Sequence, residues 1–203
     1  MNNLSNTAKK LDKVLEIAHI VFGSLAIACI VGVALIAAAY VLRLDPSMIG
    51  TGYENFDVGF LELTVAESYA PDKWMILLQA AITLAVSCRL MYDARRGVGY
   101  IREILNPMKE EKPFDTIVST NLKKLAKLSI NLGIFYNMII LSEQIMTVFV
   151  YDLPGLLVSD KITHVGGMFN VDLTFLIYWA ILLLLSYVFR YGEELQQLSD
   201  ETL

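Results

Sequence analysis

Four stretches of the chain are predominantly apolar, and most of the charged residues collect between them. The stretches are Ile17–Leu42, Trp74–Tyr92, Leu128–Val150 and Val171–Tyr191. Each matches the roughly 20 residues that a helix needs to cross a hydrocarbon core about 30 Å thick. Core helices of soluble proteins rarely extend so far without a polar face. The pattern therefore predicts an all-α membrane protein with four transmembrane helices.

The composition agrees with a bilayer environment. Of the 203 residues, 56% are hydrophobic and only 18% are charged, which leaves too few polar groups to cover the surface of a soluble domain. We therefore expect a single membrane domain over residues 1–203. The net charge of −5 provides no basic excess to release counterions from phosphates, so direct nucleic-acid binding is not expected.

The first apolar stretch has some features of a cleavable signal peptide. Lys9, Lys10 and Lys13 precede it, and Ala37–Ala39 resembles a small-residue cleavage site. However, the stretch is much longer than the hydrophobic region of a signal peptide, which has about 7–15 residues. We expect it to remain as the first transmembrane helix.

The basic residues are distributed unevenly between the loops. Of the 16 Lys and Arg residues, 13 lie before the first stretch, in or beside the loop at 93–127, or at Arg190. Only Arg43, Lys73 and Lys161 lie on the other side. Because segments rich in Lys and Arg stay in the cytoplasm, we predict that both termini and the loop at 93–127 are cytoplasmic.

The two predicted outer segments, 43–73 and 151–170, are longer than simple turns. Phe56–Val65 is strand-like in its β-branched and aromatic content. In the second segment, Pro154-Gly155 and Gly166-Gly167 are turn signals around another short apolar stretch. We predict that the two segments pair as a small extracytoplasmic β cap.

The predicted cytoplasmic loop is expected to form two helical pieces. Breaks are predicted at Asn106-Pro107 and around Lys112–Asp115, and Leu122–Leu128 leads directly into the third transmembrane helix. Either Ser119 or Asp115 can cap that helix at its start.

Glu143 is the most informative polar residue within the apolar stretches. A carboxylate inside a membrane costs on the order of a few kcal/mol unless it is paired, protonated or turned to the bundle interior. It is either a proton-linked or cation-binding group, or a structural group that hydrogen-bonds to a neighbouring helix or reaches water near the outer surface. The lack of a second intramembrane acid favours the structural role, and we predict that the side chain is interior and uncharged or paired. Asn131, Asn137 and Gln144 lie along the same helix, so we expect this helix to be interior and held by interhelical hydrogen bonds.

The sequence offers little catalytic or metal-binding chemistry. His19 and His164 are isolated and do not make a zinc site, and no phosphate-binding loop or nucleophile–base set can be assembled. Cys29 and Cys88 each lie in an apolar run and are not expected to form a disulfide. We expect neither a cofactor nor enzymatic activity.

Two surfaces are candidates for contact with other proteins. Ser24, Ala28 and Gly32 form a small-residue face on the first helix, which allows close packing of a helix from this chain or from a second copy in a homo-oligomer. The cytoplasmic loop and the tail at 192–203 combine both charge signs with apolar residues. Besides attracting anionic headgroups of the lipid bilayer, they suit a cytosolic partner. The residues predicted to bind that partner are Tyr100, Arg102, Ile104, Leu105, Phe114, Arg190, Leu195 and Leu198.

Two parts of the sequence resemble a known family. The first is Tyr100–Leu105, followed by Lys112–Asp115 and Asn121-Leu122, and the second is the ending Phe189–Leu203. With the four apolar stretches, they resemble the DUF2975 family of uncharacterised bacterial four-helix membrane proteins. The resemblance implies a location in the bacterial cytoplasmic membrane and a small helix-turn-helix transcription regulator encoded alongside. It implies no catalytic residues.

Two classes of function follow from these observations. The first is a non-enzymatic membrane regulator or adaptor, in which the cytoplasmic loop and tail bind a cytosolic protein, such as a helix-turn-helix regulator. The second is a small transporter or immunity-type protein that uses Glu143 and the polar third helix. Replacement of Glu143 by Gln separates them, because only the second class depends on a titratable group at that position.

The predicted orientation is tested by cysteine labelling in a background without Cys29 and Cys88. Single cysteines at Ser68 and Ser159 are expected to react with an impermeant maleimide in intact cells, because both positions lie in outer segments. Cysteines at Ser119 and Ser199 are expected to stay unlabelled until the cells are opened. Labelling of the second pair in sealed cells would overturn the orientation.

Overall fold

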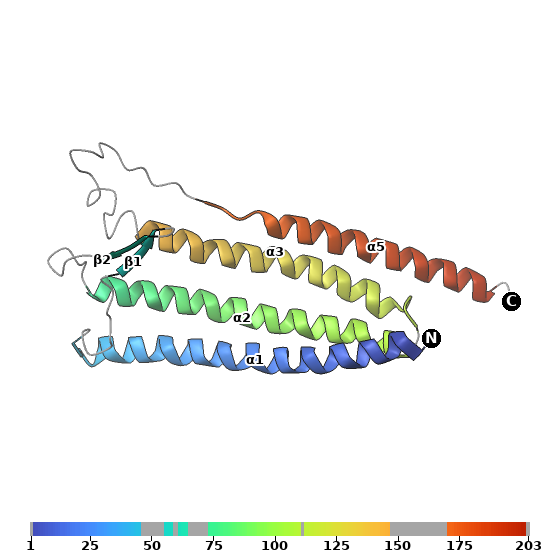
Figure 1. Ribbon diagram of the computed structural model, residues 1–203, viewed down its shortest axis with the longest axis horizontal. Helices are drawn as coiled ribbons and strands as arrows, with labels where there is room; N and C mark the ends of the chain where they lie inside the picture. Colours follow the sequence, from blue (N-terminus) through green and yellow to red (C-terminus); the bar gives the residue numbers. More distant parts are fainter. Residues whose placement is uncertain are drawn as a thin grey trace. The chain divides into compact units, whose positions relative to one another are not determined.

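The computed structural model describes residues 2–45, 55–58, 61–64, 73–110, 112–146 and 170–201. Its elements are four long helices and one short β hairpin (Figure 1). The helices are α1 (Asn2–Val41), α2 (Lys73–Lys109), α3 (Thr116–Ile145) and α5 (Thr174–Glu201). The strands are β1 (Asn55–Val58) and β2 (Leu61–Thr64).

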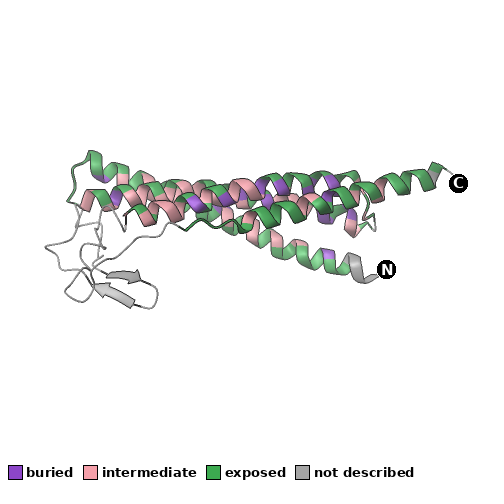
Figure 2. Ribbon diagram, turned by 90° about the horizontal axis from the view of Figure 1, so that it is seen from above, coloured by how far each residue is buried: buried purple, intermediate pink, exposed green. Residues whose placement is uncertain are grey.

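All four helices are long and apolar enough to cross a membrane, which confirms this part of the prediction. Exposed residues predominate along α1 and α5 (Figure 2), and they include large apolar side chains. Ile20 and Leu35 of α1 are each 65% exposed, and Leu184 of α5 is 64% exposed. Leaving such a side chain in water costs about 1.5–3 kcal/mol of free energy relative to burying it. The helices therefore need hydrocarbon around them.

The chain forms two compact units, and the first three helices contribute to both. Unit 1 comprises Met1–Ile27, Cys88–Tyr136 and Asp172–Leu203, whereas unit 2 comprises Ala28–Ser87 and Asn137–Val171. Unit 1 therefore contains the whole of α5 and the connection between α2 and α3.

The core of unit 1 is built from three helices. Ile104 of α2 packs with Val118 and Leu122 of α3, and Leu182 and Phe189 of α5 pack against this cluster. Side chains near the end of α2 thus meet the beginning of α3 and the middle of α5. Asp12, near the start of α1, contacts Arg102 and Lys109 near the end of α2, so in unit 1 the start of α1 lies at the same end as the α2–α3 connection.

The connection between α2 and α3 differs from the prediction at one of its two breaks. No break occurs at Asn106-Pro107, because α2 continues to Lys109 with Pro107 inside its last turn. The Pro107 carbonyl still accepts hydrogen bonds from the backbone N–H groups of Glu110 and Lys112, at 3.1 and 2.9 Å, and only two helical residues follow the proline. A proline costs less there than in a helix interior, since little of the helix remains to be disrupted.

The second predicted break is confirmed, and Asp115 is the capping residue of α3. Residues 112–115 are not helical, and Asp115 Oδ1 accepts a hydrogen bond of 2.8 Å from the Ile117 N–H. Ser119 has a different role: its side chain is buried, and its carbonyl oxygen accepts a hydrogen bond of 2.8 Å from Ser186 Oγ. Ser119 is consequently a poor labelling position, and Lys112, with a side chain 68% exposed, replaces it in the cysteine experiment.

Unit 2 contains the β hairpin and the remaining parts of α1, α2 and α3. β1 and β2 pair antiparallel, from Asn55 opposite Thr64 to Val58 opposite Leu61, so the strand-like segment of the first outer loop pairs with itself. Residues 151–169 lie outside the described residues, and pairing between the two outer segments stays a prediction. Gly32 of α1 lies against Leu84 of α2.

Only part of the small-residue face of α1 packs against another helix of the chain. Gly32 makes the close contact described above, whereas Ser24 and Ala28 are exposed. The choice between packing within the chain and a homo-oligomer therefore stays open for the exposed pair.

Two glycines allow aromatic rings to lie directly against a helix backbone in unit 1. A Cβ atom on Gly133 of α3 would overlap the Phe175 side chain of α5, including its own Cβ. A Cβ atom on Gly192 of α5 would overlap the Phe114 ring. Because the atoms met at Gly133 include the base of the phenylalanine side chain, rotation of the ring alone cannot make room.

We predict that Gly133→Ala destabilises the protein although alanine favours helices. Overpacking typically costs about 1–3 kcal/mol, which exceeds the gain of about 1 kcal/mol from replacing a helical glycine. Gly99→Ala is the matched control in α2, because nothing lies within 4 Å of the added Cβ. Thermal unfolding in detergent should show a lower midpoint for Gly133→Ala and an unchanged or higher midpoint for Gly99→Ala. Equal midpoints would contradict the close contact with Phe175.

Candidate functional site

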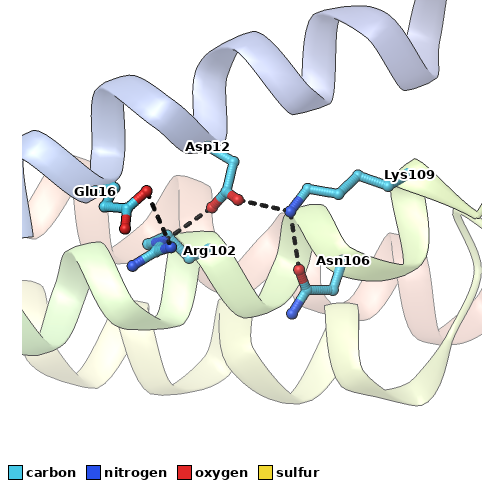
Figure 3. A network of polar contacts seen from close by, with 5 residues as sticks. All are labelled: Asp12, Glu16, Arg102, Asn106 and Lys109. Carbon is cyan, nitrogen blue, oxygen red and sulfur yellow. Dashed lines mark hydrogen bonds and ion pairs between the residues drawn. The ribbon is translucent and has the colours of Figure 1, made fainter.

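A carboxylate of α1 joins two basic residues of α2 in unit 1 (Figure 3). Asp12 accepts hydrogen bonds of 2.8 Å from Arg102 Nε and of 2.8 Å from Lys109 Nζ. Lys109 Nζ also donates to Asn106 Oδ1 at 3.1 Å, and Arg102 Nη2 lies 4.0 Å from Glu16 Oε2. The side chains of Asp12 and Lys109 are each 22% exposed, so the pair is only partly screened by solvent.

This network changes the role expected for Arg102. The sequence predicts it to bind a partner, but the structure places its guanidinium group on Asp12 of the same chain. Asp12 and Glu16 lie one helical turn apart in a segment otherwise rich in lysine. That spacing is the sequence signal for two acids facing one neighbouring helix.

A second polar cluster contains the most buried charged residue of the described part of the chain, Asp93. Its side chain is 0% exposed, and Arg89 Nε donates to its Oδ2 at 3.0 Å. Arg96 Nη1 lies 3.6 Å from Oδ1, an ion pair without a hydrogen bond. The spacing of these three residues along α2 places them on one helix face. The sequence pattern does not single out Asp93, because this residue directly follows an apolar stretch and falls in the predicted loop at 93–127.

Aromatic rings separate the cations of this cluster. The guanidinium carbon of Arg89 lies 5.7 Å from the Tyr92 ring centroid and 5.6 Å from that of Phe135. The Arg96 carbon lies 5.9 Å from the Tyr92 and Tyr100 rings, and Arg96 Nη2 donates to the Tyr100 hydroxyl at 3.0 Å. We call this set the arginine–aromatic stripe; it consists of Arg89, Tyr92, Asp93, Arg96 and Tyr100 of α2 with Lys124 and Phe135 of α3.

The start of α3 and the C-terminal half of α5 meet, as expected for the loop and the tail. The Phe114 ring centroid lies 5.9 Å from that of Phe189, and the Thr116 hydroxyl donates to the Glu193 carboxylate. Arg190, which is predicted to bind a partner, lies 3.3 Å from Glu194 of the same helix. Beside these contacts is a cleft of about 550 Å³ lined by residues of both helices, including Lys123, Ser186 and Tyr187.

The predicted partner-binding residues divide into a buried group and an exposed group. Ile104 and Leu105 are only 7% and 6% exposed, so the expectation that they form a docking stripe is wrong. Their side chains are buried in unit 1, since an apolar stripe on an amphipathic helix packs inward wherever neighbouring helices are available. Leu195 and Leu198 are 49% and 60% exposed. Phe114 is 42% exposed despite its contacts with α5.

The polar residues predicted in the third helix have different surroundings. Asn137 is buried, and Asn131 is partly buried. Gln144 Oε1 accepts a hydrogen bond of 3.1 Å from the Asn170 N–H, and Gln144 Nε2 donates to the Asn170 carbonyl at 3.4 Å. Gln144 therefore ties α3 to the segment before α5 within unit 2.

The expectation that Glu143 faces the bundle interior is wrong, because its side chain is exposed. Glu143 lies two residues before Ile145, the last residue given for α3. A carboxylate toward the end of an apolar stretch costs less than one at its centre, because the cost of a charge falls toward the membrane surface.

Other candidate chemistry is limited in the part of the chain that the structure describes. No group of three or more His, Cys, Asp and Glu residues there is arranged to hold a metal ion. Cys29 and Cys88 are free thiols. His19 Nε2 accepts a hydrogen bond of 3.3 Å from Arg95 Nε, whose guanidinium group also lies against Gly23.

We predict that removing both arginines around Asp93 is more harmful than removing the whole cluster. In Arg89→Gln/Arg96→Gln the buried carboxylate loses its countercharges. We expect a loss on the order of 1–3 kcal/mol, below the ~3–5 kcal/mol typical of fully buried pairs because both arginines are about half exposed. Adding Asp93→Asn should restore most of the loss in thermal unfolding midpoint in detergent. No recovery in the triple variant would show that ion pairing at Asp93 is not the source of the stability.

Comparison with known proteins adds no family assignment. No protein-family model, curated protein or solved structure matches this chain. The resemblance to the DUF2975 family stays a prediction from the sequence, and what is shown is a multi-pass protein with four helices able to span a membrane.

Proposed function

We propose that this protein is a non-enzymatic membrane regulator or adaptor that binds a cytosolic protein through the C-terminal turns of α5. One observation carries the proposal: Leu195 and Leu198 remain 49% and 60% exposed on a helix that continues to Glu201. In unit 1 the neighbouring apolar residues Ile104 and Leu105 are buried. The tail thus offers the apolar groups that a partner can cover.

The length of α5 supports a position of these leucines outside the hydrocarbon. The helix has 28 residues, which corresponds to about 42 Å at 1.5 Å per residue. A hydrocarbon core about 30 Å thick needs only about 20 of them. Because the apolar run ends at Tyr191, Leu195 and Leu198 lie in the part of the helix beyond the membrane.

The charge of the tail indicates what kind of partner it suits. Leu195 and Leu198 are three residues apart and share one helix face. They are accompanied by four acidic residues, Glu193, Glu194, Asp200 and Glu201. An amphipathic helix of this type binds in an apolar groove, and acidic neighbours favour a groove with a basic rim.

A helix-turn-helix regulator satisfies this requirement, because proteins that bind DNA carry basic surfaces. The predicted cytoplasmic orientation and the family resemblance lead to the same class of partner. In this proposal the acidic helix occupies a surface that overlaps the regulator's DNA-binding surface, so membrane capture and DNA binding compete.

The transporter alternative receives less support from the site. It relies on Glu143 as an interior titratable group, and this side chain is exposed in the last turn of α3. The polar residue Gln144, next to it in sequence, is engaged with the Asn170 backbone.

We predict that Leu195→Ser/Leu198→Ser abolishes co-purification of a specific cytosolic protein without affecting membrane insertion. Both side chains are exposed, so the thermal unfolding midpoint should stay within the error of the wild type. The matched control is Gln196→Ser/Gln197→Ser, which changes two exposed polar residues of the same turns. The measurement is quantitative mass spectrometry of proteins recovered in mild detergent after photo-crosslinking in cells. Recovery of the same proteins with both double variants would refute binding through the leucines.

A further inference from the structure

The arginine–aromatic stripe holds two guanidinium groups in fixed positions while leaving them accessible. Arg89 and Arg96 are 46% and 45% exposed, although each is bound on one side to the fully buried Asp93. Each guanidinium group carries five N–H donors. The contacts with Asp93 and Tyr100 engage one nitrogen of Arg89 and two of Arg96. Donors therefore remain on the exposed edges of both groups.

The aromatic rings orient these groups further. Tyr92 lies between the two arginines, at 5.7 Å from the Arg89 guanidinium carbon and 5.9 Å from that of Arg96. Lys124 Nζ lies 5.3 Å from the Tyr100 ring and adds a third cation from α3. Contacts between a cation and a ring use the face of the guanidinium group and leave its edge for hydrogen bonding. The stripe is thus preorganised to bind an anion that offers two oxygen atoms as hydrogen-bond acceptors.

The position of the stripe identifies where that anion comes from. The second apolar stretch ends at Tyr92, so the stripe crosses the boundary between hydrocarbon and headgroups on a membrane-spanning helix. Tyrosine is typical of this boundary. The cluster holds three cations and one acid, so its local charge is positive. At this depth, the most concentrated anion is the phosphate of a lipid headgroup.

We propose that the arginine–aromatic stripe is a binding site for the phosphate of an anionic phospholipid. The edges of Arg89 and Arg96 donate to the phosphate oxygens, Lys124 adds a favourable charge, and Tyr92, which is 50% exposed, packs against the upper part of the lipid. Asp93 acts as a positioning residue, since it fixes both arginines from the buried side. The site is separate from Leu195 and Leu198, so this inference does not depend on the proposed function.

Arg95 shows that not every basic residue at this boundary has such a role. It neighbours Arg96 in sequence, but its guanidinium group lies against Gly23 and donates to His19 of α1. The two arginines of the stripe differ from it in being held by a buried acid and separated by a ring. A general attraction of lysines and arginines to anionic membranes does not require this arrangement.

The test uses the full-length protein, delipidated in a neutral detergent and analysed by native mass spectrometry. The probes are dioleoyl phosphatidylglycerol, dioleoyl phosphatidylcholine and inorganic phosphate. We expect phosphatidylglycerol to bind at least about 10-fold more tightly than phosphatidylcholine, and inorganic phosphate not to displace it. Displacement by inorganic phosphate at comparable concentrations, or equal affinity for the two lipids, would overturn the proposal of an anionic lipid site.

A pair of variants with the same net charge distinguishes binding at the arginine–aromatic stripe from a general effect of charge. Arg89→Gln/Asp93→Asn/Arg96→Gln loses two positive charges and one negative charge, so its net charge changes by the same amount as in the control Arg190→Gln. We expect phosphatidylglycerol affinity to fall about 10-fold in the triple variant, as for loss of charge-assisted bonds, and to change less than about 2-fold in the control. Similar losses in both would overturn the site.

A second variant with a smaller change tests the site if the triple variant does not fold. Arg89→Lys/Arg96→Lys preserves every charge but removes the planar donor pairs. We expect a several-fold loss of phosphatidylglycerol affinity with an unchanged helical circular dichroism spectrum. Wild-type affinity in this variant would show that charge alone accounts for binding, and the proposed site would be abandoned.

Discussion

Hydrocarbon solvates a charge poorly, and this constraint governs where the charged clusters of the described residues lie. The four apolar stretches contain few charged groups, and those near their ends are held by partners on the same or a neighbouring helix. Asp12 joins α1 to α2 through Arg102 and Lys109, and Asp93 is enclosed by Arg89 and Arg96. Pairing lowers the cost of bringing these groups close to lipid. The Asp12 pairs also connect α1 to α2, whereas the Asp93 pairs lie within α2.

The helices themselves follow from the sequence, since length and apolarity are enough to indicate a membrane-spanning segment. Local chemistry limits the start of α3 to two capping residues, Asp115 and Ser119, and the structure assigns the cap to Asp115. The break predicted at Pro107 is absent, because the sequence does not tell whether a proline falls in the middle of a helix or in its last turn. Periodicity likewise indicates that Ile104 and Leu105 share an apolar face without indicating what covers that face. For Ile104 the covering residues are Val118 and Leu122 of another helix.

The candidate sites were less predictable than the helices. Leu195 and Leu198 could be identified because the apolar pattern continues into the acidic tail beyond the membrane segment. Asp93 was missed, since its burial depends on the packing of α2 against its neighbours and not on the residues beside it. Glu143 shows the limit of arguing from the residue type alone, since the apolar stretch indicates that a carboxylate is costly there but does not indicate toward which side the helix turns it.

The close contacts of Gly133 and Gly192 have a mechanical consequence for α5. Phe175 and Gly192 lie near opposite ends of this continuous helix, and both are engaged with α3 or the segment before it. A helix transmits rotation along its axis, and packed rings and backbones do not deform gradually. Rotation of α5 about its axis would separate Phe175 from Gly133 and Gly192 from Phe114. The two contacts together therefore fix which face of α5 is turned toward α3 and the segment before it.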